Sequence, residues 1–415
     1  MLSLCSETCG IGADPWEEER DVASHLSYMR SVETRSGRDS PFLPLDKCEE
    51  FKWPSLFAEI DEMLESTVLI EQLSRNKSLS APRSFPMTHI EIRSLLYKEY
   101  KTIPEALPRN ASNSKSARYT PTTVIELEKS RDEVVYSVAV NHQRKRVTVC
   151  FEGSTNLLDY MLSRPSLMKS QENPVKKFNP GATDYVNIHQ VLHSFLFDCS
   201  ANSARGPTGK ILSKYHETLY NHIVPVFRKY PSYKLYFTGH GFGGALATVY
   251  GMFAASEPHT LIPAPVTVVS FGSPYIGDIR FRAAHQCLER MGRLRNVRIS
   301  NHQDMVTITP QITPLATQWF KHVGVNLRLY AGLYPLDISY PRMGSGLIWE
   351  SIDECSRGWD QSVVTNFPWN TRSALGHHHL DVYKNRLKQN EGELRTISLN
   401  DIYVCRQVVG ESFLA

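Results

Sequence analysis

The segment at 238–247 carries the strongest indication of chemistry in the sequence. It reads TGHGFGGALA, follows the strand-like run YKLYFT at 233–238 and opens a helical pattern. A strand, a tight glycine-flanked turn and a helix form a nucleophile elbow, G-x-S-x-G, whose central serine attacks a carbonyl carbon. Gly239 and Gly243 occupy the flanking positions, but the central residue is Gly241, which has no hydroxyl. The pattern indicates nucleophilic catalysis with its nucleophile missing; a glycine-rich turn that cradles phosphate is the alternative.

Two further side-chain types that such a site needs occur later in the chain. Asp304 follows the strand-like run RNVRIS at 295–300, so its carboxylate is predicted to lie beyond the end of a strand. The run HHH at 377–379 supplies imidazole groups. Adjacent residues of a helix point in different directions, so we predict one functional histidine, His378 or His379, and no metal site. The residue types and their order indicate a histidine that a carboxylate orients.

The elements that must position these residues alternate between strand and helix. Strand-like runs lie at 134–140, 146–152, 233–238, 266–271 and 295–300, and helix-period segments lie at 209–229, 243–256 and 278–290. Such alternation predicts an α/β fold with a mostly parallel central sheet and helices on both faces. The first two runs are separated only by NHQRK and are predicted to form an antiparallel hairpin.

Several separate segments resemble the class 3 (fungal-type) lipases and their plant phospholipase A1 relatives, which are α/β-hydrolases. FEGSTNLLDY at 151–160 is similar to F-R-G-[ST]-x-x-x-x-D-W, and the elbow is similar to T-G-H-S-L-G-G-A-L-A. FGSPYIGD at 271–278, NHQDMV at 301–306 and HHLDVY at 378–383 resemble F-G-S-P-R-V-G-[ND], N-x-x-D-x-V and H-x-L-x-x-Y. The resemblance covers roughly residues 120–385 and favours the elbow over the phosphate cradle.

The resemblance implies a role for each matching position. Asp304 corresponds to the acid of the catalytic triad. His378 fits the plant-type spacing of the triad histidine and His379 fits the fungal pattern, and we prefer His378 slightly. Ser154 and the main-chain N–H of Phe242 correspond to the oxyanion hole. No cofactor is implied, because this chemistry needs none.

Several positions depart from the family pattern. Gly241 lacks the attacking hydroxyl, Glu152 stands in place of an arginine, and Tyr160 stands in place of a tryptophan. Glycine removes the strain that a side chain suffers at a positive φ angle, so the elbow is expected to persist. His240 is expected to be structural and to form hydrogen bonds within the turn.

Composition and charge exclude several other classes of protein. The chain has 415 residues, of which 41% are hydrophobic and 21% charged, as is typical of a folded soluble protein. The formal net charge is only +3, with no basic stripe that would indicate nucleic-acid binding. The first residues do not resemble a signal peptide, and the most apolar stretches are too short to span a membrane. We therefore expect a cytoplasmic protein.

The sequence is predicted to divide into four segments. Residues 1–48 are sparse in apolar side chains and indicate a flexible, acidic leader. Residues 49–120 are predicted to form a helical extension and linker, residues 121–390 the lipase-like α/β-hydrolase domain, and residues 391–415 a C-terminal segment.

The resemblance implies a hydrolase of triacylglycerol or phospholipid acyl esters that is impaired because its elbow reads GHGFG. The alternative is a lipase-like pseudoenzyme that binds an acyl chain or a protein without hydrolysis. Under the first hypothesis the partner is a lipid or acyl ester, with transient contact to a membrane or lipid-droplet surface. A third hypothesis is a scaffold whose functional part is the helical region at 49–103.

Overall fold

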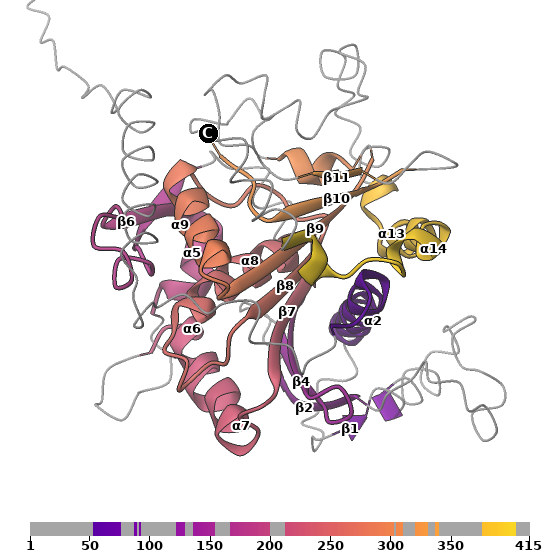
Figure 1. The fold of residues 1–415 in the computed structure, drawn as a ribbon, viewed down its shortest axis with the longest axis horizontal. Coiled ribbons are helices and arrows are strands. Elements are labelled where there is room, and N and C mark those ends of the chain that lie inside the picture. Colours follow the sequence, from indigo (N-terminus) through magenta and orange to yellow (C-terminus); the bar gives the residue numbers. More distant parts are fainter. Residues whose placement is uncertain are drawn as a thin grey trace, which may run out of the picture.

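The fold is centred on a twisted sheet between two layers of helices (Figure 1). The computed structural model describes residues 53–75, 87–88, 91–92, 122–128, 136–153, 167–199, 212–302, 304–309, 320–330, 337–339 and 376–403. Within these residues, no helix is both long and apolar enough to cross a lipid bilayer.

The central sheet has nine strands, and its middle is parallel. In spatial order the strands are β1 (Met87–Thr88), β2 (Thr122–Glu128), β3 (Tyr136–Asn141), β4 (Arg146–Phe151), β7 (Lys234–His240), β8 (Val266–Phe271), β9 (Leu294–Asn301), β10 (Val325–Leu329) and β11 (Asp337–Ser339). The strands from β4 to β10 run parallel to one another, and the outer pairs are antiparallel. The predicted hairpin is confirmed as the antiparallel pair β3–β4. A separate antiparallel pair is formed by β5 (Met168–Glu172) and β6 (Tyr185–His189).

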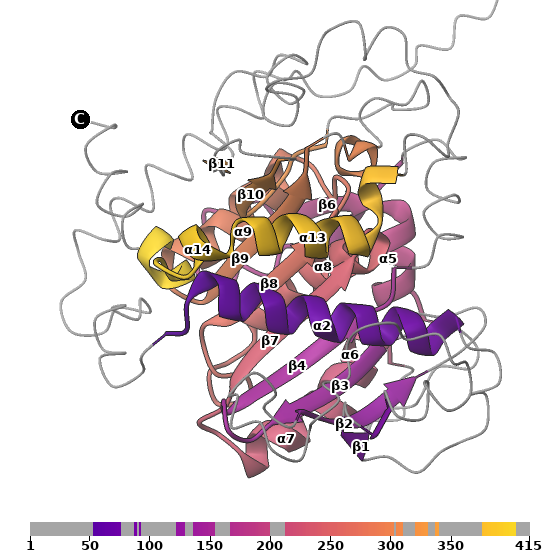
Figure 2. The ribbon, with the colours of Figure 1, turned by 90° about the vertical axis from the view of Figure 1, so that its right-hand side faces the viewer.

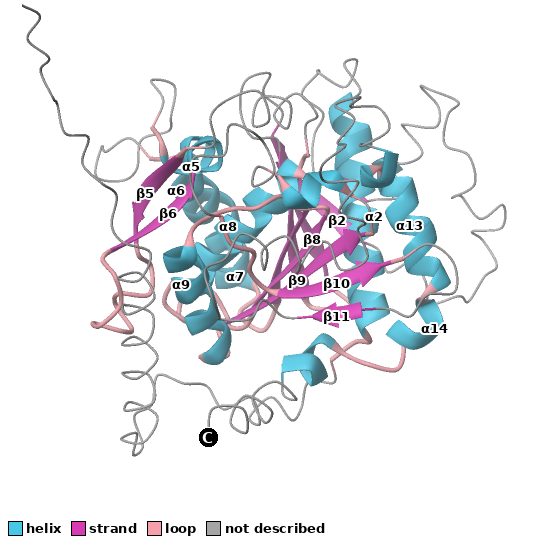
Figure 3. Cartoon of the chain, turned by 90° about the horizontal axis from the view of Figure 1, so that it is seen from above, coloured by secondary structure: helices cyan, strands magenta, loops and turns pink. Residues whose placement is uncertain are grey.

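Helices cover both faces of the sheet, as the alternation of patterns predicts (Figure 3). One face carries α5 (Gln190–Phe197), α6 (Lys214–Glu217), α7 (Val224–Lys229), α8 (Phe242–Ser256) and α9 (Ile279–Arg290). The other face carries α2 (Leu56–Arg75), α13 (Leu380–Gln389) and α14 (Glu391–Leu394). Because β8 is covered on both faces, every residue of its apolar run VTVVSF is buried. This architecture is the α/β-hydrolase fold.

The helix predicted over 209–229 is interrupted. The described part consists of α6, the π-helical turn η3 (Thr218–Ile223) and α7, which has a proline in its first turn. That residue, Pro225, has no N–H to donate to the preceding turn, and a π-type turn accommodates such a break in the hydrogen-bond ladder. A helical period in the sequence does not distinguish these variants.

Helix α2 packs across the sheet beside α13 (Figure 2). Its residues Leu56, Ile60 and Met63 share a core cluster with strands β8–β10 and with Leu399 and Tyr403 near the other end of the described chain. The helix predicted as part of an extension therefore shares one core with the sheet.

A buried ion pair joins α2 to the sheet. Nη2 of Arg295 on β9 lies 3.0 Å from Oε1 of Glu59, and it also donates to Oγ1 of Thr267 at 2.7 Å. The hydroxyl of Tyr236 donates to the same Glu59 oxygen at 2.5 Å. Both charged side chains are almost fully buried. Burial raises the pKa of Tyr236 to about 12, so its hydroxyl remains a donor at neutral pH.

Removing one member of this pair is expected to destabilise the fold strongly. Glu59→Met leaves the Arg295 guanidinium buried without its counter-charge, and we expect a loss of about 3–5 kcal/mol in unfolding free energy. The double variant Glu59→Met with Arg295→Met is expected to recover part of that loss, because no charge is left buried, although the Tyr236 hydroxyl still lacks its acceptor. Urea unfolding of the parent, both single variants and the double variant measures the interaction free energy between Glu59 and Arg295. Equal losses of stability in Glu59→Met and in the double variant would contradict the prediction.

Candidate functional site

The elbow lies between the end of β7 and the start of α8. Gly241 has φ 52° and ψ −118°, in the left-handed region that favours glycine. Its N–H donates to the carbonyl oxygen of Phe271 on the neighbouring strand at 2.8 Å. A residue with a side chain at such an angle costs about 1–3 kcal/mol of backbone strain. Glycine therefore maintains the turn without that strain.

The end of β4 packs directly on the elbow through main-chain atoms. A Cβ atom at Gly153 would lie 2.1 Å from the carbonyl oxygen of His240, and one at Gly243 would lie 2.4 Å from that of Phe151. No side chain fits at either position. This contact brings the strand that precedes Ser154 to the start of α8, the helix that begins at the predicted oxyanion partner Phe242. Ser154 itself lies outside the described residues.

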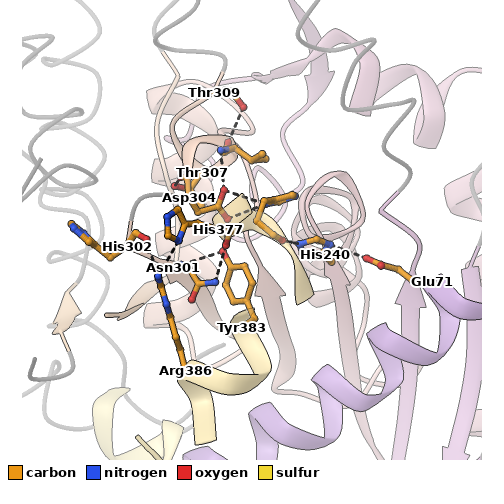
Figure 4. A network of polar contacts seen from close by, with 12 residues as sticks. Glu71, His240, Asn301, His302, Asp304, Thr307, Thr309, His377, Tyr383 and Arg386 are labelled. Atoms are coloured by element: carbon orange, nitrogen blue, oxygen red, sulfur yellow. Dashed lines mark hydrogen bonds and ion pairs between the residues drawn. The ribbon is translucent and has the colours of Figure 1, made fainter. Parts of the chain in front are cut away.

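Asp304 and His378 form a buried carboxylate–imidazole pair. Nδ1 of His378 lies 2.9 Å from Oδ2 of Asp304 and 3.2 Å from Oδ1. The hydroxyl of Tyr383 donates to Oδ2 at 2.5 Å, and it accepts the N–H of Asn301 at 3.1 Å. Figure 4 shows Tyr383 and Asn301 beside Asp304. Tyr383 was not predicted as a site residue, although it closes the HHLDVY segment.

The electrostatics of this pair favour an ionised carboxylate. Burial acts to raise the pKa of Asp304, but the His378 imidazole and the hydrogen bonds from His378 and Tyr383 outweigh it, so the pKa lies below its usual value. Asp304 therefore remains ionised at neutral pH, as a carboxylate that orients an imidazole must.

The lowered pKa predicts a pH dependence of stability. A depressed carboxyl pKa contributes stability that is fully present above the unfolded-state value of about 4 and is lost as the pH falls through the folded-state value. Asp304→Asn is therefore expected to be less stable than the parent at about pH 6–7, with a difference that narrows below about pH 4. Denaturant unfolding of both proteins between about pH 3 and pH 7 measures this difference in unfolding free energy. A difference that does not change with pH would contradict the prediction.

His378 is the histidine that approaches the elbow. A Cβ atom built on Gly241 would lie 2.8 Å from Nε2 of His378. Gly272, at φ 57°, also lies against this ring, because a Cβ there would be 2.8 Å from both Nδ1 and Cε1. His379 is exposed and occupies the N-cap position of α13, without a capping hydrogen bond from its side chain. The structure thus brings Gly241, His378 and Asp304 together and leaves His379 apart.

Three hydroxyl groups at or near the ends of β7 and β8 are fully buried, and two of them form hydrogen bonds away from the elbow centre. Thr238 lies 3.2 Å from the hydroxyl of Thr67 on α2, and Ser273 donates to the carbonyl oxygen of Pro274. Ser270 is fully buried beneath α8, where its Cβ would lie 3.2 Å from a Cβ at Gly244. Among the residues placed by the structure, we identify no hydroxyl that replaces the missing nucleophile.

Two sequence predictions need correction or completion. His240 was expected to bond within the turn, but its Nδ1 lies 2.8 Å from Oε1 of Glu71 on α2 and its Nε2 lies 2.7 Å from the carbonyl oxygen of His378. Glu152, the charge reversal, accepts a short hydrogen bond from the hydroxyl of Ser74 at the end of α2. These contacts join residues far apart in sequence, which a local pattern cannot reveal.

The segment at 157–170, interpreted as a lid or a core helix, lies mostly outside the described residues, and its end is the start of β5.

The phosphate-cradle alternative is not favoured by the surroundings of the turn. The letters GHGFGG at 239–244 also satisfy G-x-G-x-x-G, the pattern of dinucleotide-binding loops. In the structure, however, the His378 ring lies against Gly241 and the Asp304 carboxylate lies directly behind that ring. An imidazole backed by a carboxylate serves proton transfer better than phosphate binding, because the carboxylate repels an anion.

The described chain has the fold of the α/β-hydrolases, with the elbow after β7, the carboxylate after β9 and the later histidine in the chain order of that fold. The family model "Lipase (class 3)" matches residues 148–313, which include the elbow and Asp304. This region of the chain belongs to the class 3 lipase family.

Curated relatives and solved structures are similar over part of the chain. "Phospholipase A1-II 3" of Oryza sativa subsp. indica is 26% identical over 197 residues, which are 46% of this chain and 43% of that protein. The chain thus spans 43% of the length of that relative. Lipase II from Rhizopus niveus has a TM-score of 0.45 at 18% identity and covers 74% of this chain and 90% of its own. The lipase from Rhizopus microsporus var. chinensis has a TM-score of 0.44 at 17% identity and covers 72% and 82%.

Proposed function

We propose that this chain binds lipid acyl esters at the elbow and hydrolyses them slowly, because the nucleophile position holds glycine. One observation carries the proposal: Nε2 of His378 lies 2.8 Å from where a Cβ of residue 241 would be, while Nδ1 of the same ring bonds to Asp304. The imidazole thus lies beside position 241, and after a small withdrawal of the ring it could act as a general base towards a hydroxyl there. Without that hydroxyl, no acyl-enzyme can form through residue 241.

The family supports an ester of a lipid as the ligand. The matched model is that of a lipase, and the curated relatives from rice are named as phospholipase A1. We therefore propose triacylglycerol or phospholipid acyl esters as the substrate class, with transient contact at a membrane or lipid-droplet surface.

A second candidate is a pseudoenzyme that binds an acyl chain or a protein without turnover. Gly241 favours it directly. Glu152 also favours a pseudoenzyme, because its carboxylate accepts a hydrogen bond from Ser74 of α2 just after β4, the strand that leads to Ser154. In this function the carboxylate–imidazole pair would be retained as a polar feature beside the elbow.

The experiment compares the protein with its Gly241→Ser variant. Both are incubated with a serine-reactive fluorophosphonate probe and with short- and long-chain p-nitrophenyl esters. We expect the parent neither to label nor to turn over substrate efficiently, and the serine variant to do both. Labelling of the parent would overturn the proposal, because another nucleophile would exist. Failure of both proteins would favour the binding function.

A further inference from the structure

A second carboxylate–imidazole pair lies beside the first. Glu71 is in the last turns of α2, and its Oε1 is 2.8 Å from Nδ1 of His240. Both side chains are about nine-tenths buried. Figure 4 shows Glu71 pointing from α2 towards His240. The pair therefore brings the N-terminal helix to the residue next to the elbow centre.

His240 in turn contacts His378 in two ways. Its Nε2 donates to the main-chain carbonyl oxygen of His378 at 2.7 Å. Its ring stacks on the His378 ring with centroids 4.2 Å apart and planes inclined by 26°. The first contact fixes the backbone that carries His378, and the second fixes the plane of its imidazole. Both act on the ring that faces Gly241.

The hydrogen-bond pattern around His240 requires Glu71. A carbonyl oxygen only accepts, so the proton on Nε2 is committed to His378. Burial and the neighbouring His378 lower the pKa of His240, although the Glu71 carboxylate opposes them. The 2.8 Å contact between Nδ1 and Oε1 of Glu71 requires one proton between the two atoms, which the ring and the carboxyl group share. A residue that can neither donate nor accept here leaves a buried nitrogen without a partner, which costs about 1–3 kcal/mol and allows the ring to turn.

We propose that Glu71 is a positioning residue for the hydrolase site: through His240, it sets where the His378 imidazole lies relative to Gly241 and Asp304. This inference rests on the proposed function, because it assigns His378 the role of base. It makes α2 a functional part of the site. Only one side chain, the imidazole of His240, lies between the Glu71 carboxyl group and the His378 base.

The first test uses the chain with its native Gly241 and does not depend on activity. Selective labelling of histidine allows NMR detection of the Nδ1 proton of His378, which the hydrogen bond to Asp304 shifts to low field; its loss in His378→Gln assigns it. We expect the resonance in the parent and in Glu71→Gln, whose amide can donate to Nδ1 of His240. We expect it to broaden or vanish in Glu71→Leu. Glu71→Asp, which shortens the reach of the carboxyl, provides the same comparison if Glu71→Leu does not fold.

Glu65→Leu is the matched control. Glu65 lies on the same helix and forms an ion pair with Lys384 of α13 at 3.3 Å. Its removal costs an α2–α13 contact without touching His240. We expect the low-field resonance to survive in this variant. Loss of the resonance in Glu65→Leu as well as in Glu71→Leu would overturn the proposal, because general loosening of α2 would then explain both.

The second test measures catalysis in the Gly241→Ser background. We expect Glu71→Leu to lower kcat about 10²-fold with little change in KM, since displacement of a base by about 1 Å has that effect. Glu71→Gln is expected to retain most of the activity. An unchanged kcat in Glu71→Leu, with an unchanged His378 resonance, would overturn the positioning role. If Gly241→Ser itself is inactive, the proposed function fails while the NMR comparison still decides the role of Glu71.

Discussion

Serine at position 241 is expected to raise kcat for ester hydrolysis by about 10³-fold or more. In serine hydrolases the loss of the nucleophile costs about 10⁶-fold in kcat, which sets the upper limit of the gain. The expected gain is smaller, because a Cβ on residue 241 would lie only 2.8 Å from Nε2 of His378, and the ring must withdraw to admit a hydrogen bond. Stacking on His240 and the bond to Asp304 restrict that withdrawal. Steady-state kinetics on a p-nitrophenyl ester measures the gain.

The Gly241→Ala variant distinguishes the effect of the serine hydroxyl from the effect of the added Cβ atom. Alanine places the same Cβ at the same positive φ, so both variants should lose about 1–3 kcal/mol of stability through backbone strain. Only the serine variant is expected to gain activity. Equal hydrolysis by the parent and the two variants would show that turnover does not proceed through residue 241.

Loss of the Asp304 carboxylate has the second large expected effect. In the Gly241→Ser background, Asp304→Asn is expected to lower kcat about 10⁴-fold, because an amide of the same shape does not stabilise the imidazolium that forms when His378 takes the serine proton. KM is expected to change little, since Asp304 is buried behind the imidazole. A pre-steady-state measurement of acylation should show the same decrease.

Asp381→Asn is the control for this prediction. Asp381 is exposed in the first turn of α13, only a few residues from His378. The substitution removes one carboxylate charge near the site without touching the imidazole. Its kcat should remain within about twofold of the parent, whereas a decrease comparable to that of Asp304→Asn would indicate a general field effect.

Much of the fold follows from local patterns. The apolar run at 266–271 coincides with β8, and the helical pattern at 243–256 matches α8 to within one residue. Such runs are readable because strands buried on both faces must be continuously apolar, and a central helix must be apolar all round. The pattern at 209–229 was less informative, because a π-helical stretch of six residues is too short to change the apolar period of the whole segment visibly.

The arrangement of the site was only partly predictable. The elbow and Asp304 are marked by short motifs at strand ends. The choice between His378 and His379 depends on where α13 begins, which a run of three histidines does not reveal. Glu71 carries no local signal, because it contacts His240 from 169 residues away. Contacts of that kind arise from the packing of α2 on the sheet.

The glycines around the elbow have a consequence for how this chain can change over time. A side chain at 153 or 243 would collide with the main chain of the neighbouring segment, whatever residue occupies position 241. Their retention is therefore enforced by folding and does not depend on an attacking group at position 241. Position 241 is constrained differently, since its own Cβ would meet the His378 ring rather than main-chain atoms and would stand at a strained positive φ. The glycines that make the motif recognisable are thus retained for packing, and they do not report whether the site has its nucleophile.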